Sequence, residues 1–414
     1  MRRAPLLSSL ILLIGCVGDS AVVSPLPSND ASTQDSSSPP KDGGGGDVSV
    51  ADAADASAVL CGFAGEGCCV KPLAPCNDGM ICSTSSKTCV ASDAWAVGHF
   101  MPQAFVQKMV TAHWDGSAWA LGEAMDPQPN VANFYPLDIF QEGSAVRFIA
   151  NGNNNAGGKM FAWNSVMWVE TKANTAYSAP LTNVNGMLPV LGAVSSIGGE
   201  FWLAGNATVY RCAQNASNCA KADMGVAASW AQGAFGGVDT TDFWFTDTLN
   251  LLHFDGKTWT KNNSVVPSDL FGMGWVSPKD IWIGRTKMRH WDGATWSPAQ
   301  LIEGAPVPGA IYSISGGVTD DVWAVGNNNN AVSFAAHWNG TDWKYSKVPQ
   351  GATGIVKVWA PGRSEAFMVG DKSGLFRWDG TAWSAMPTPT ASKTVPANTV
   401  ITWDAIHGSA RPRR

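Results

Sequence analysis

The stretch His290-Trp-Asp-Gly-Ala-Thr-Trp296 decides the fold, because its pattern Trp-Asp/Asn-Gly-x-x-Trp returns along the chain at similar spacing. An Asp-Gly pair is typical of a tight β-hairpin turn, since Gly adopts positive φ, and the two tryptophans are then expected to face each other across the hairpin. Rings in this position bury a large apolar area, so they are predicted to be core residues between repeats and not a ligand platform. Clear copies begin at Trp114, Trp291, Trp338 and Trp378, and looser copies at Trp163 and Phe254.

The number of repeats follows from a second feature, an apolar segment with a central aromatic residue, such as Asp93-Ala-Trp-Ala-Val-Gly98. It occurs seven times at steps of about 40 to 50 residues, the length of a β-propeller blade of four short strands. One blade alone cannot cover its hydrophobic faces, so the chain is predicted to be an all-β protein with a seven-bladed β-propeller over residues 91–414. The central aromatic residues are Trp95, Phe148, Trp202, Trp244, Trp282, Trp323 and Phe367.

The two ends of this region are predicted to complete one blade. The first apolar segment follows Cys89 too closely to leave room for a strand of its own, while Ile401-Thr-Trp-Asp-Ala-Ile-His-Gly408 has the pattern of a first strand with no blade after it. A C-terminal strand that pairs into the first blade closes the ring and removes sheet edges that would otherwise recruit other chains. We therefore expect a monomer.

The N-terminus is predicted to direct export and lipid anchoring. Residues 1–15 have the charged start and short apolar run of a signal peptide, too short to span a bilayer. Leu13-Ile-Gly-Cys16 resembles a bacterial lipobox, so Cys16 is the expected lipidation site; an incidental cysteine after an ordinary signal peptide is the alternative. Residues 16–60 are predicted to be a flexible tether, because they are rich in Ser, Asp, Ala, Pro and Gly. The expected location is the bacterial cell envelope, at the outer membrane or cell surface, with the lipid as the only membrane contact.

Residues 61–90 are predicted to form a small disulfide-rich module, because six cysteines of an exported chain fall within about 30 residues. The vicinal pair is not expected to bond to each other, and the connectivity otherwise stays open. Zinc is the competing interpretation, but the segment contains no His. The cysteine spacing resembles small modules of the Dickkopf N-terminal type. The six residues are Cys61, Cys68, Cys69, Cys76, Cys82 and Cys89.

A further cysteine pair belongs to the propeller itself. The third repeat lacks the tryptophan hairpin and has Cys212 and Cys219 in its place. In an exported chain, these two cysteines are predicted to bond to each other and to substitute for the aromatic pair.

Composition restricts the classes of partner. The 414 residues are 45% hydrophobic and 14% charged with 44 Gly, which favours short strands and tight turns. The net charge is −6, and no Lys/Arg cluster alternates with aromatic residues, so nucleic acid is not an expected partner.

From residue 93 onward, the phrases Asp-Val-Trp-Ala-Val-Gly and His-Trp-Asp-Gly-x-x-Trp resemble the tryptophan-rich propeller repeats of bacterial surface proteins. More distantly they are similar to kelch/galactose-oxidase and sialidase propellers. A sialidase Asp-box has Asp-x-Gly at a comparable hairpin, whereas Asp292 and Gly293 are adjacent here. The resemblance implies the fold and does not carry a function.

Catalysis, a metal and a cofactor are not expected. A copper radical centre of the galactose-oxidase kind needs a free Cys, and all nine cysteines are assigned to lipid or disulfides. A glycosidase needs two facing carboxylates, which the sequence does not bring together from residues such as Glu142, Glu170, Glu303 and Asp371.

The histidines also favour structural roles. Four of them occupy one repeat position before Trp or Phe, which indicates packing or turn hydrogen bonding: His113, His253, His290 and His337. The other two, His99 and His407, are expected to lie near each other in the first blade as a structural pair.

The leading hypothesis is a surface-displayed binding module for a glycan or a protein. Propeller ligands usually bind where the loops between strands B and C and between strands D and A meet, and these loops differ from blade to blade. The long loop expected at residues 99–112 carries Phe100 and Phe105. A glycan-active enzyme (glycosidase or lyase) and a purely structural envelope protein are the alternatives. The candidate ligand-binding residues are Asn153, Asn154, Asn155, Asn328, Asn329, Arg285, Lys287 and Asp371.

Overall fold

The computed structural model separates two compact units, Met1–Ser57 and Ala58–Arg414, and all features below belong to the second. It describes residues 81–82, 89–90 and 93–408, apart from 128–132, 143–144, 153–156, 171–190, 198–199, 206–207, 213–218, 226–233, 248, 266–269, 271, 278, 303–307, 329–331 and 363–364. The predicted signal peptide, Cys16, the tether and the first four cysteines of the module lie outside these residues. No helix in the described part of the chain is long and apolar enough to cross a membrane.

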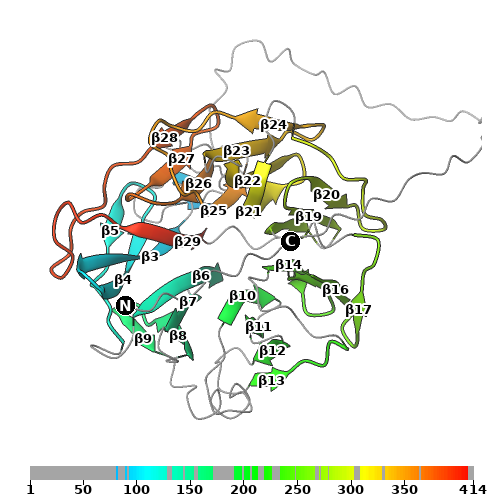
Figure 1. The fold of residues 1–414 in the computed structure, drawn as a ribbon, viewed down its shortest axis with the longest axis horizontal. Coiled ribbons are helices and arrows are strands. Elements are labelled where there is room, and N and C mark those ends of the chain that lie inside the picture. The colour runs from blue at the N-terminus through cyan, green and yellow to red at the C-terminus, as the bar shows by residue number, and fades with distance from the viewer. Residues whose placement is uncertain are drawn as a thin grey trace, which may run out of the picture. The chain divides into compact units, whose positions relative to one another are not determined.

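The fold is an all-β, seven-bladed β-propeller, as predicted (Figure 1). Each blade is an antiparallel sheet whose strands we call A to D from the inside outward. Blade 1 consists of β29 (Thr402–Gly408), β3 (Ala94–Gln103), β4 (Val106–Trp114) and β5 (Trp119–Leu121). Blade 2 consists of β6 (Phe134–Glu142), β7 (Ala145–Gly152), β8 (Gly157–Trp163) and β9 (Trp168–Glu170). Blade 3 consists of β10 (Leu191–Ile197), β11 (Glu200–Gly205), β12 (Thr208–Cys212) and β13 (Cys219–Lys221).

The remaining four blades follow the same order. Blade 4 consists of β14 (Ala234–Asp239), β15 (Asp242–Thr246), β16 (Leu251–Phe254) and β17 (Trp259–Lys261). Blade 5 has three strands, β18 (Gly272–Ser277), β19 (Asp280–Gly284) and β20 (Met288–Trp291). Blade 6 consists of β21 (Pro308–Val318), β22 (Asp321–Asn328), β23 (Ser333–Trp338) and β24 (Trp343–Ser346). Blade 7 consists of β25 (Lys357–Gly362), β26 (Glu365–Val369), β27 (Leu375–Trp378) and β28 (Trp383–Ala385).

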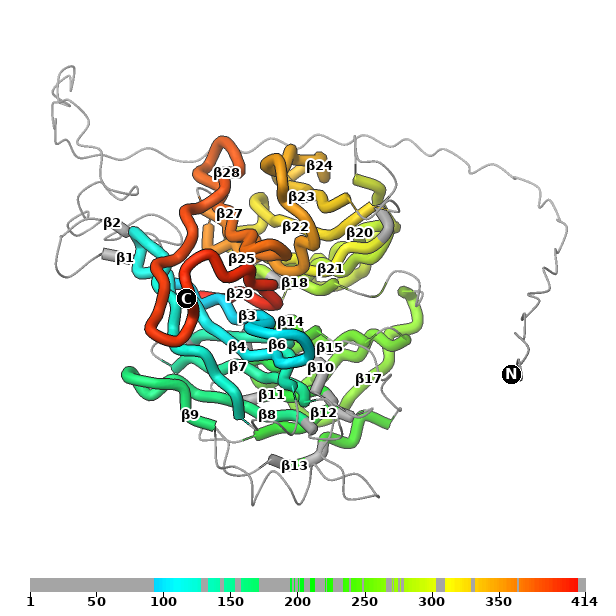
Figure 2. Tube along the Cα trace, turned by 60° about the vertical axis from the view of Figure 1, so that its left-hand side comes forward, coloured from blue at the N-terminus to red at the C-terminus, as the bar shows by residue number. Residues whose placement is uncertain are grey.

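The C-terminal strand closes the ring, as predicted. β29 pairs antiparallel with β3, from Thr402 opposite His99 to Gly408 opposite Ala94, and the red and blue segments lie side by side in Figure 2. Each innermost strand contacts the innermost strand of the next blade, and β29 contacts both β25 and β6. The first blade therefore joins strands from the two ends of the described chain, and the ring has no open edge between blades.

The outer part of blade 5 differs from the expected four strands. Beyond the hairpin, only isolated bridges form, between Trp291 and Trp296 and between Met288 and Gln300. Pro298 lies between these bridges, and a proline has no N–H to donate to a ladder. The fourth strand is therefore reduced to these two bridges and a bond from the N–H of Ser297 to the carbonyl of His290 at 2.7 Å.

The tryptophan hairpins pack between blades, as predicted. Trp338 and Trp343 are directly opposed across strands C and D of blade 6, and both rings contact Trp282 of blade 5, at 4.8 and 5.1 Å. Trp378 and Trp383 of blade 7 contact Trp323 of blade 6 in the same way, at 4.8 and 5.0 Å. Each hairpin thus closes over the central aromatic residue of the preceding blade. The hairpins of blades 5, 4, 2 and 1 contact Trp244, Trp202, Trp95 and Phe367.

The segment 99–112 is not the long loop that the sequence analysis expected. β3 and β4 continue as a ladder to Gln103 opposite Val106, and the turn is formed by Ala104 and Phe105 alone. Phe100 is buried, whereas Phe105 at the turn is 92% exposed. The apolar alternation of the segment allows paired strands, and we call the part that extends from Phe100 to Lys108 the blade 1 hairpin.

Candidate functional site

The repeated histidines form a structural unit inside four blades. In blade 6, the imidazole of His337 stacks on Trp323 with ring centroids 4.3 Å apart, and its Nε2 is hydrogen bonded to Asp321 at the start of strand B. The same Asp–His–Trp unit occurs in blades 1, 4 and 5, with the stacked pairs Trp95–His113, Trp244–His253 and Trp282–His290 at 4.2, 4.4 and 4.3 Å. These histidines are thus held within the framework and are not directed toward a common centre.

The other three blades use different residues at the same three positions. In blade 7, Arg377 replaces the histidine and bonds to Glu365 at 2.7 Å. In blade 3, Arg211 bonds to both carboxylate oxygens of Glu200 at 2.7 Å. Blade 2 has an apolar version, in which Phe148 stacks on Phe161 at 4.7 Å. Since strands B and C pair these positions directly in every blade, the repeated residues are fully used in building the framework.

Blade 3 carries the cysteine pair. Cys212 is disulfide-bonded and stands opposite Cys219 in the register of β12 and β13. Four residues of the predicted disulfide-rich module are also described. They form β1 (Ile81–Cys82) and β2 (Cys89–Val90), which pair with Cys82 opposite Cys89.

Non-repeated polar residues gather at the inner rim of the face that carries the B–C and D–A loops, which we call the loop face. His99 continues strand B of blade 1 past its apolar part, and its Nδ1 lies 2.7 Å from Oδ2 of Asp404 on strand A. The two side chains are 18% and 21% exposed. A carboxylate at Nδ1 fixes the imidazole and leaves Nε2 as the atom that a ligand can reach.

Residues of blades 7 and 2 complete this group on either side. Lys357, the first residue of β25, bonds to Asp138 of β6 at 3.0 Å, which connects the innermost strands of blades 7 and 2 past β29. Tyr135, at the start of β6, is exposed and lies edge-on to His99 at 5.7 Å. We call the six residues the mouth cluster: His99, Tyr135, Asp138, Lys357, Asp371 and Asp404.

Asp371 is held by a tight turn between strands B and C of blade 7. Its N–H donates to the carbonyl of Thr353 at 3.0 Å, and its carboxylate lies against the backbone of Gly354, where a Cβ atom would come within 2.1 Å of Oδ2. Gly354 also has a φ of 57°, so two independent constraints require glycine there. The side chain of Asp371 itself is exposed.

The electrostatics of the mouth cluster disfavour the charged form of Asp404. Burial raises the pKa of this carboxyl, and the negative charge of Asp371 raises it further, while the hydrogen bond and the charge of His99 lower it. The balance is a raised pKa, so Asp404 is a carboxylate that a hydrogen-bond donor or a cation would stabilise.

The remaining predicted ligand residues divide into three groups. Asn153, Asn154, Asn155 and Asn329 lie outside the described residues. Asn328 closes the B–C turn of blade 6, because its Oδ1 accepts the N–H of Val332 at 3.0 Å. Arg285 and Lys287 are exposed in the B–C turn of blade 5. Of the four that the structure describes, Asp371 is the one that lies in the mouth cluster.

One further expectation needs correction. His99 and His407 do not form a pair, because His99 opposes Thr402 and His407 opposes Trp95, at opposite ends of β29. His407 instead accepts the backbone N–H of Gln141 at 3.1 Å. Of the carboxylates considered for catalysis, Glu170 bonds to Lys159 at 2.5 Å on the outer strands of blade 2.

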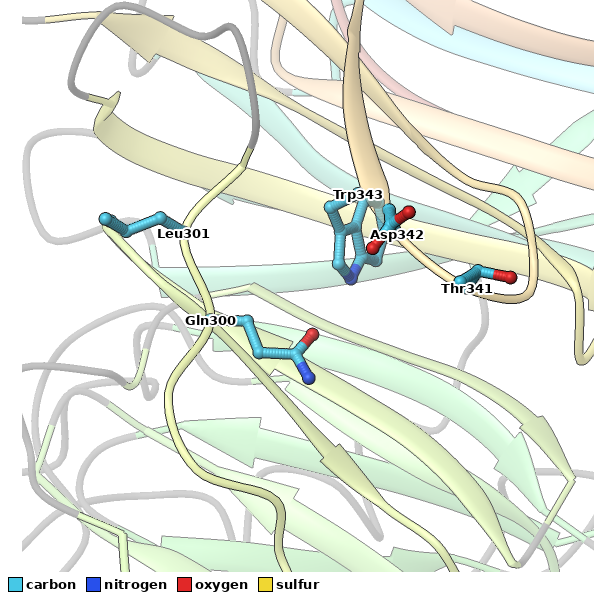
Figure 3. A pocket seen from close by; sticks show the side chains of 5 residues that line it. All are labelled: Gln300, Leu301, Thr341, Asp342 and Trp343. Atoms are coloured by element: carbon cyan, nitrogen blue, oxygen red, sulfur yellow. The ribbon is translucent and has the colours of Figure 1, made fainter.

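A small pocket lies away from the mouth cluster, between the outer part of blade 5 and the C–D hairpin of blade 6 (Figure 3). Gln300 and Asp342 line it, and Leu301 points away from Trp343. Trp343 is 2% exposed because its ring packs against Trp282, so it offers no platform to a ligand. Among the described residues, no group of three or more His, Cys, Asp or Glu side chains is placed to hold a metal ion.

The chain is similar to several solved structures at low sequence identity. No known family model matches the chain, and no curated protein matches its sequence. YCF48 bound to the D1 peptide is similar at 12% identity with a TM-score of 0.45, over 73% of this chain and 94% of that one. The six-bladed lectin of Aleuria aurantia, which recognises fucose, is similar at 13% identity with a TM-score of 0.40, over 64% and 98%. The WD40 domain of Neurospora crassa Pan2 is similar at 12% identity with a TM-score of 0.42, over 70% and 94%.

Proposed function

We propose that this chain is a lipid-anchored binding protein of the bacterial cell surface, whose propeller takes a glycan or protein ligand on the loop face without catalysis. The lipid is attached at Cys16, residues 16–60 are the tether, and residues 61–90 are a disulfide-rich module. One observation carries the binding role. The repeated Asp, His and Trp side chains pack and hydrogen bond within and between blades. The non-repeated polar side chains of blades 7, 1 and 2 instead gather at one rim.

The mouth cluster suits ligand binding because it combines fixed and open groups. Asp404 and Lys357 are each held by one partner in the cluster, so their positions are set before a ligand arrives. Tyr135 and Asp371 are exposed beside them. Preorganised polar groups with an adjacent aromatic ring are what small recognition sites require.

The anchor and the binding role are tested separately. Cys16→Ser should move the protein from the membrane fraction to the soluble fraction, because it removes the acylated atom. The Cys16→Ser protein, folded and oxidised, should bind saturably to a component of a glycan array or a peptide library. Asp404→Asn should weaken that binding, and an unfolded control should abolish it. Binding that Asp404→Asn leaves unchanged would place the site elsewhere.

A glycan-active enzyme is the second candidate, and one feature of the mouth cluster favours it. His99, whose Nδ1 is held by the partly buried carboxylate of Asp404, has the arrangement of a general base. Incubation with polysaccharide and analysis of the products tests this directly. Turnover that His99→Asn abolishes would replace the binding proposal. If the folded protein retains the glycan and releases no products, the binding proposal is supported.

A further inference from the structure

Strand B is longer in blade 1 than in blade 7 on the loop face. It continues past the central aromatic residue from Trp95 to Gln103 in blade 1, but only from Phe367 to Val369 in blade 7. At about 3.3 Å per residue, strand B of blade 1 is roughly 20 Å longer in this part than strand B of blade 7. It therefore forms a wall beside the mouth cluster.

The turn at the top of this wall holds an aromatic residue in an unfavourable conformation. Phe105 has a φ of 63°, a region that bulky residues seldom enter, and its side chain is 92% exposed. The side chain of Asn133 fixes this turn, since Nδ2 donates to the carbonyl of Phe105 at 3.1 Å and Oδ1 accepts the N–H of Gln107 at 3.0 Å. The fold gains no packing from the ring, and Gly or Asn would suit the backbone better.

Other exposed apolar side chains lie on the same side of the molecule. Met101, on the hairpin, is 66% exposed, and Val400, directly before β29, is also 66% exposed. Met101 lies two residues after His99 on β3, where the register with β4 shifts between Phe100 and Gln103. Apolar contacts thus surround the open edge of the mouth cluster, with hydrogen-bonding groups at its base.

This combination fits a polypeptide better than a glycan or a lipid surface. Aromatic and methionine side chains are enriched at protein interfaces, and a buried contact of this kind provides most of the binding energy. The carboxylates of Asp371 and Asp404 would oppose an anionic membrane. An added β-strand is also disfavoured, because Pro102 has no N–H to donate to it.

We propose, resting on the binding function above, that the ligand is a polypeptide segment with a Lys or Arg close to an apolar residue. The apolar residue packs on Phe105 and Met101, and the cation reaches Asp404 at the base of the blade 1 hairpin. Lys357 is already paired with Asp138, whereas Asp404 bonds to His99. Among the described residues, Asp404 is therefore the carboxylate at which we expect the cation of the ligand.

The test uses a phage library of random 12-residue peptides and a glycan array, both against the folded Cys16→Ser chain. The selected peptides should share a Lys or Arg within a few residues of an apolar side chain. Asp404→Asn and Phe105→Asn should each weaken their binding at least tenfold. Phe105→Asn should not lower the melting temperature, since Asn tolerates positive φ, and loss of binding would then not be loss of folding.

Two variants on other surfaces are matched controls. Asp379→Asn makes the same chemical change in a C–D hairpin, and Met167→Asn replaces another exposed apolar residue with Asn. Both should bind the selected peptides as the parent does.

Each other outcome counts against part of the proposal. Peptides that bind both site variants as well as the parent would overturn the polypeptide site. Glycan binding that Asp404→Asn abolishes, without peptide selection, would overturn the ligand class and leave the proposed function standing. No binding to either library by folded protein would overturn both.

Discussion

Blade 1 and blade 6 have the same inner framework but differ in chain connectivity and in the features that they carry on the loop face. Both contain an Asp–His–Trp unit, with stacked rings at 4.2 and 4.3 Å, and both are covered by the tryptophan hairpin of the next blade. Blade 6 is built from one continuous segment, whereas blade 1 takes its inner strand from the far end of the chain and carries the raised hairpin and His99–Asp404. The comparison teaches that the repeat specifies the scaffold, and that function is to be sought where a blade departs from it.

Deletion of residues 399–414 should have the largest effect and distinguishes blade 1 from blade 6 most clearly. It removes β29, exposes the inner edge of β3 and leaves Trp403 and Ile406 absent from the core of blade 1. We expect an aggregating protein, measured by size-exclusion chromatography with light scattering. Deletion of residues 409–414 alone is the control. A monomer with unchanged melting after the longer deletion would contradict the closure.

Trp323→Ala in blade 6 should cost about 3–5 kcal/mol of unfolding free energy, because it removes a fully buried ring from between two blades. Trp95→Ala in blade 1 should have a similar cost if the two frameworks are equivalent. Denaturant titration of both variants measures this. A much smaller loss in blade 1 would show that the closed blade is held mainly by β29.

Within the repeated framework, the cost of losing the acid should follow its burial. Asp321 of blade 6 is 5% exposed and Asp242 of blade 4 is 47% exposed, although both bond to the histidine of their unit. Asp321→Ala should cost about 2–4 kcal/mol, since the bond that His337 loses is to a buried carboxylate, and Asp242→Ala less than about 1 kcal/mol. Equal losses in denaturant titrations would mean that stacking on Trp, and not the ion pair, holds the histidine.

Asp404→Asn in blade 1 should change stability in the opposite direction. The pKa of Asp404 is raised, so its contribution to stability is largest when it is protonated at low pH and declines as the pH rises through its pKa in the folded protein. A neutral Asn should therefore give a modest increase in unfolding free energy at pH 7 that disappears near pH 3. Lower stability at pH 7 would show that the bond to His99 outweighs the cost of burying the charge.

The smallest effect concerns the hairpin turns. The pKa of Asp115 in blade 1 is lowered, first by the N–H of Ala118 and then by the hydroxyl of Ser117, and that of Asp379 in the corresponding turn of blade 7 falls to about 2. Blade 6 has Asn339 in the same role, accepting the N–H groups of Thr341 and Asp342 at 3.0 Å.

A depressed carboxyl pKa contributes stability that is present above the unfolded value and lost as the pH falls through the folded value. Asp379→Asn should thus flatten the acid melting curve between about pH 4 and pH 2, and Asn339→Asp should steepen it. Circular dichroism melts across this range measure both, and an unchanged slope in both variants would exclude the turns as a source of acid sensitivity.

The sequence was sufficient for the framework because the framework repeats. The Asp-Gly turns and paired tryptophans recur with one spacing, and the observed φ of 94° at Gly293 and Gly380 is the conformation that the pattern implies. The closure was also predictable, because Ile401 to Gly408 is apolar in the manner of a first strand with no blade to follow.

The mouth cluster could not be read in the same way. His99 and Asp404 are 305 positions apart in the chain, and no local pattern connects them. One signal was present, since Asp404 and Asp138 each place a charge inside an innermost strand. The Asn-rich loops were predicted to bind ligand because of their composition, but the side chain of Asn328 accepts a hydrogen bond within its own turn. The raised hairpin was mistaken for a loop because Pro102 and Gln103 interrupt the apolar alternation of residues 94–101.

The position of β29 also determines when the propeller can close during synthesis of the chain. Six blades can form from segments already made, but the ladder on β3 stays open until Thr402 to Gly408 arrive. Contacts between such distant positions form late, because closing a long loop costs entropy before the contacts that offset this cost are made. A polypeptide that stops short of Thr402 cannot finish the ring, and it also lacks Asp404. The last strand thereby makes completion of the fold and completion of the proposed binding site a single event.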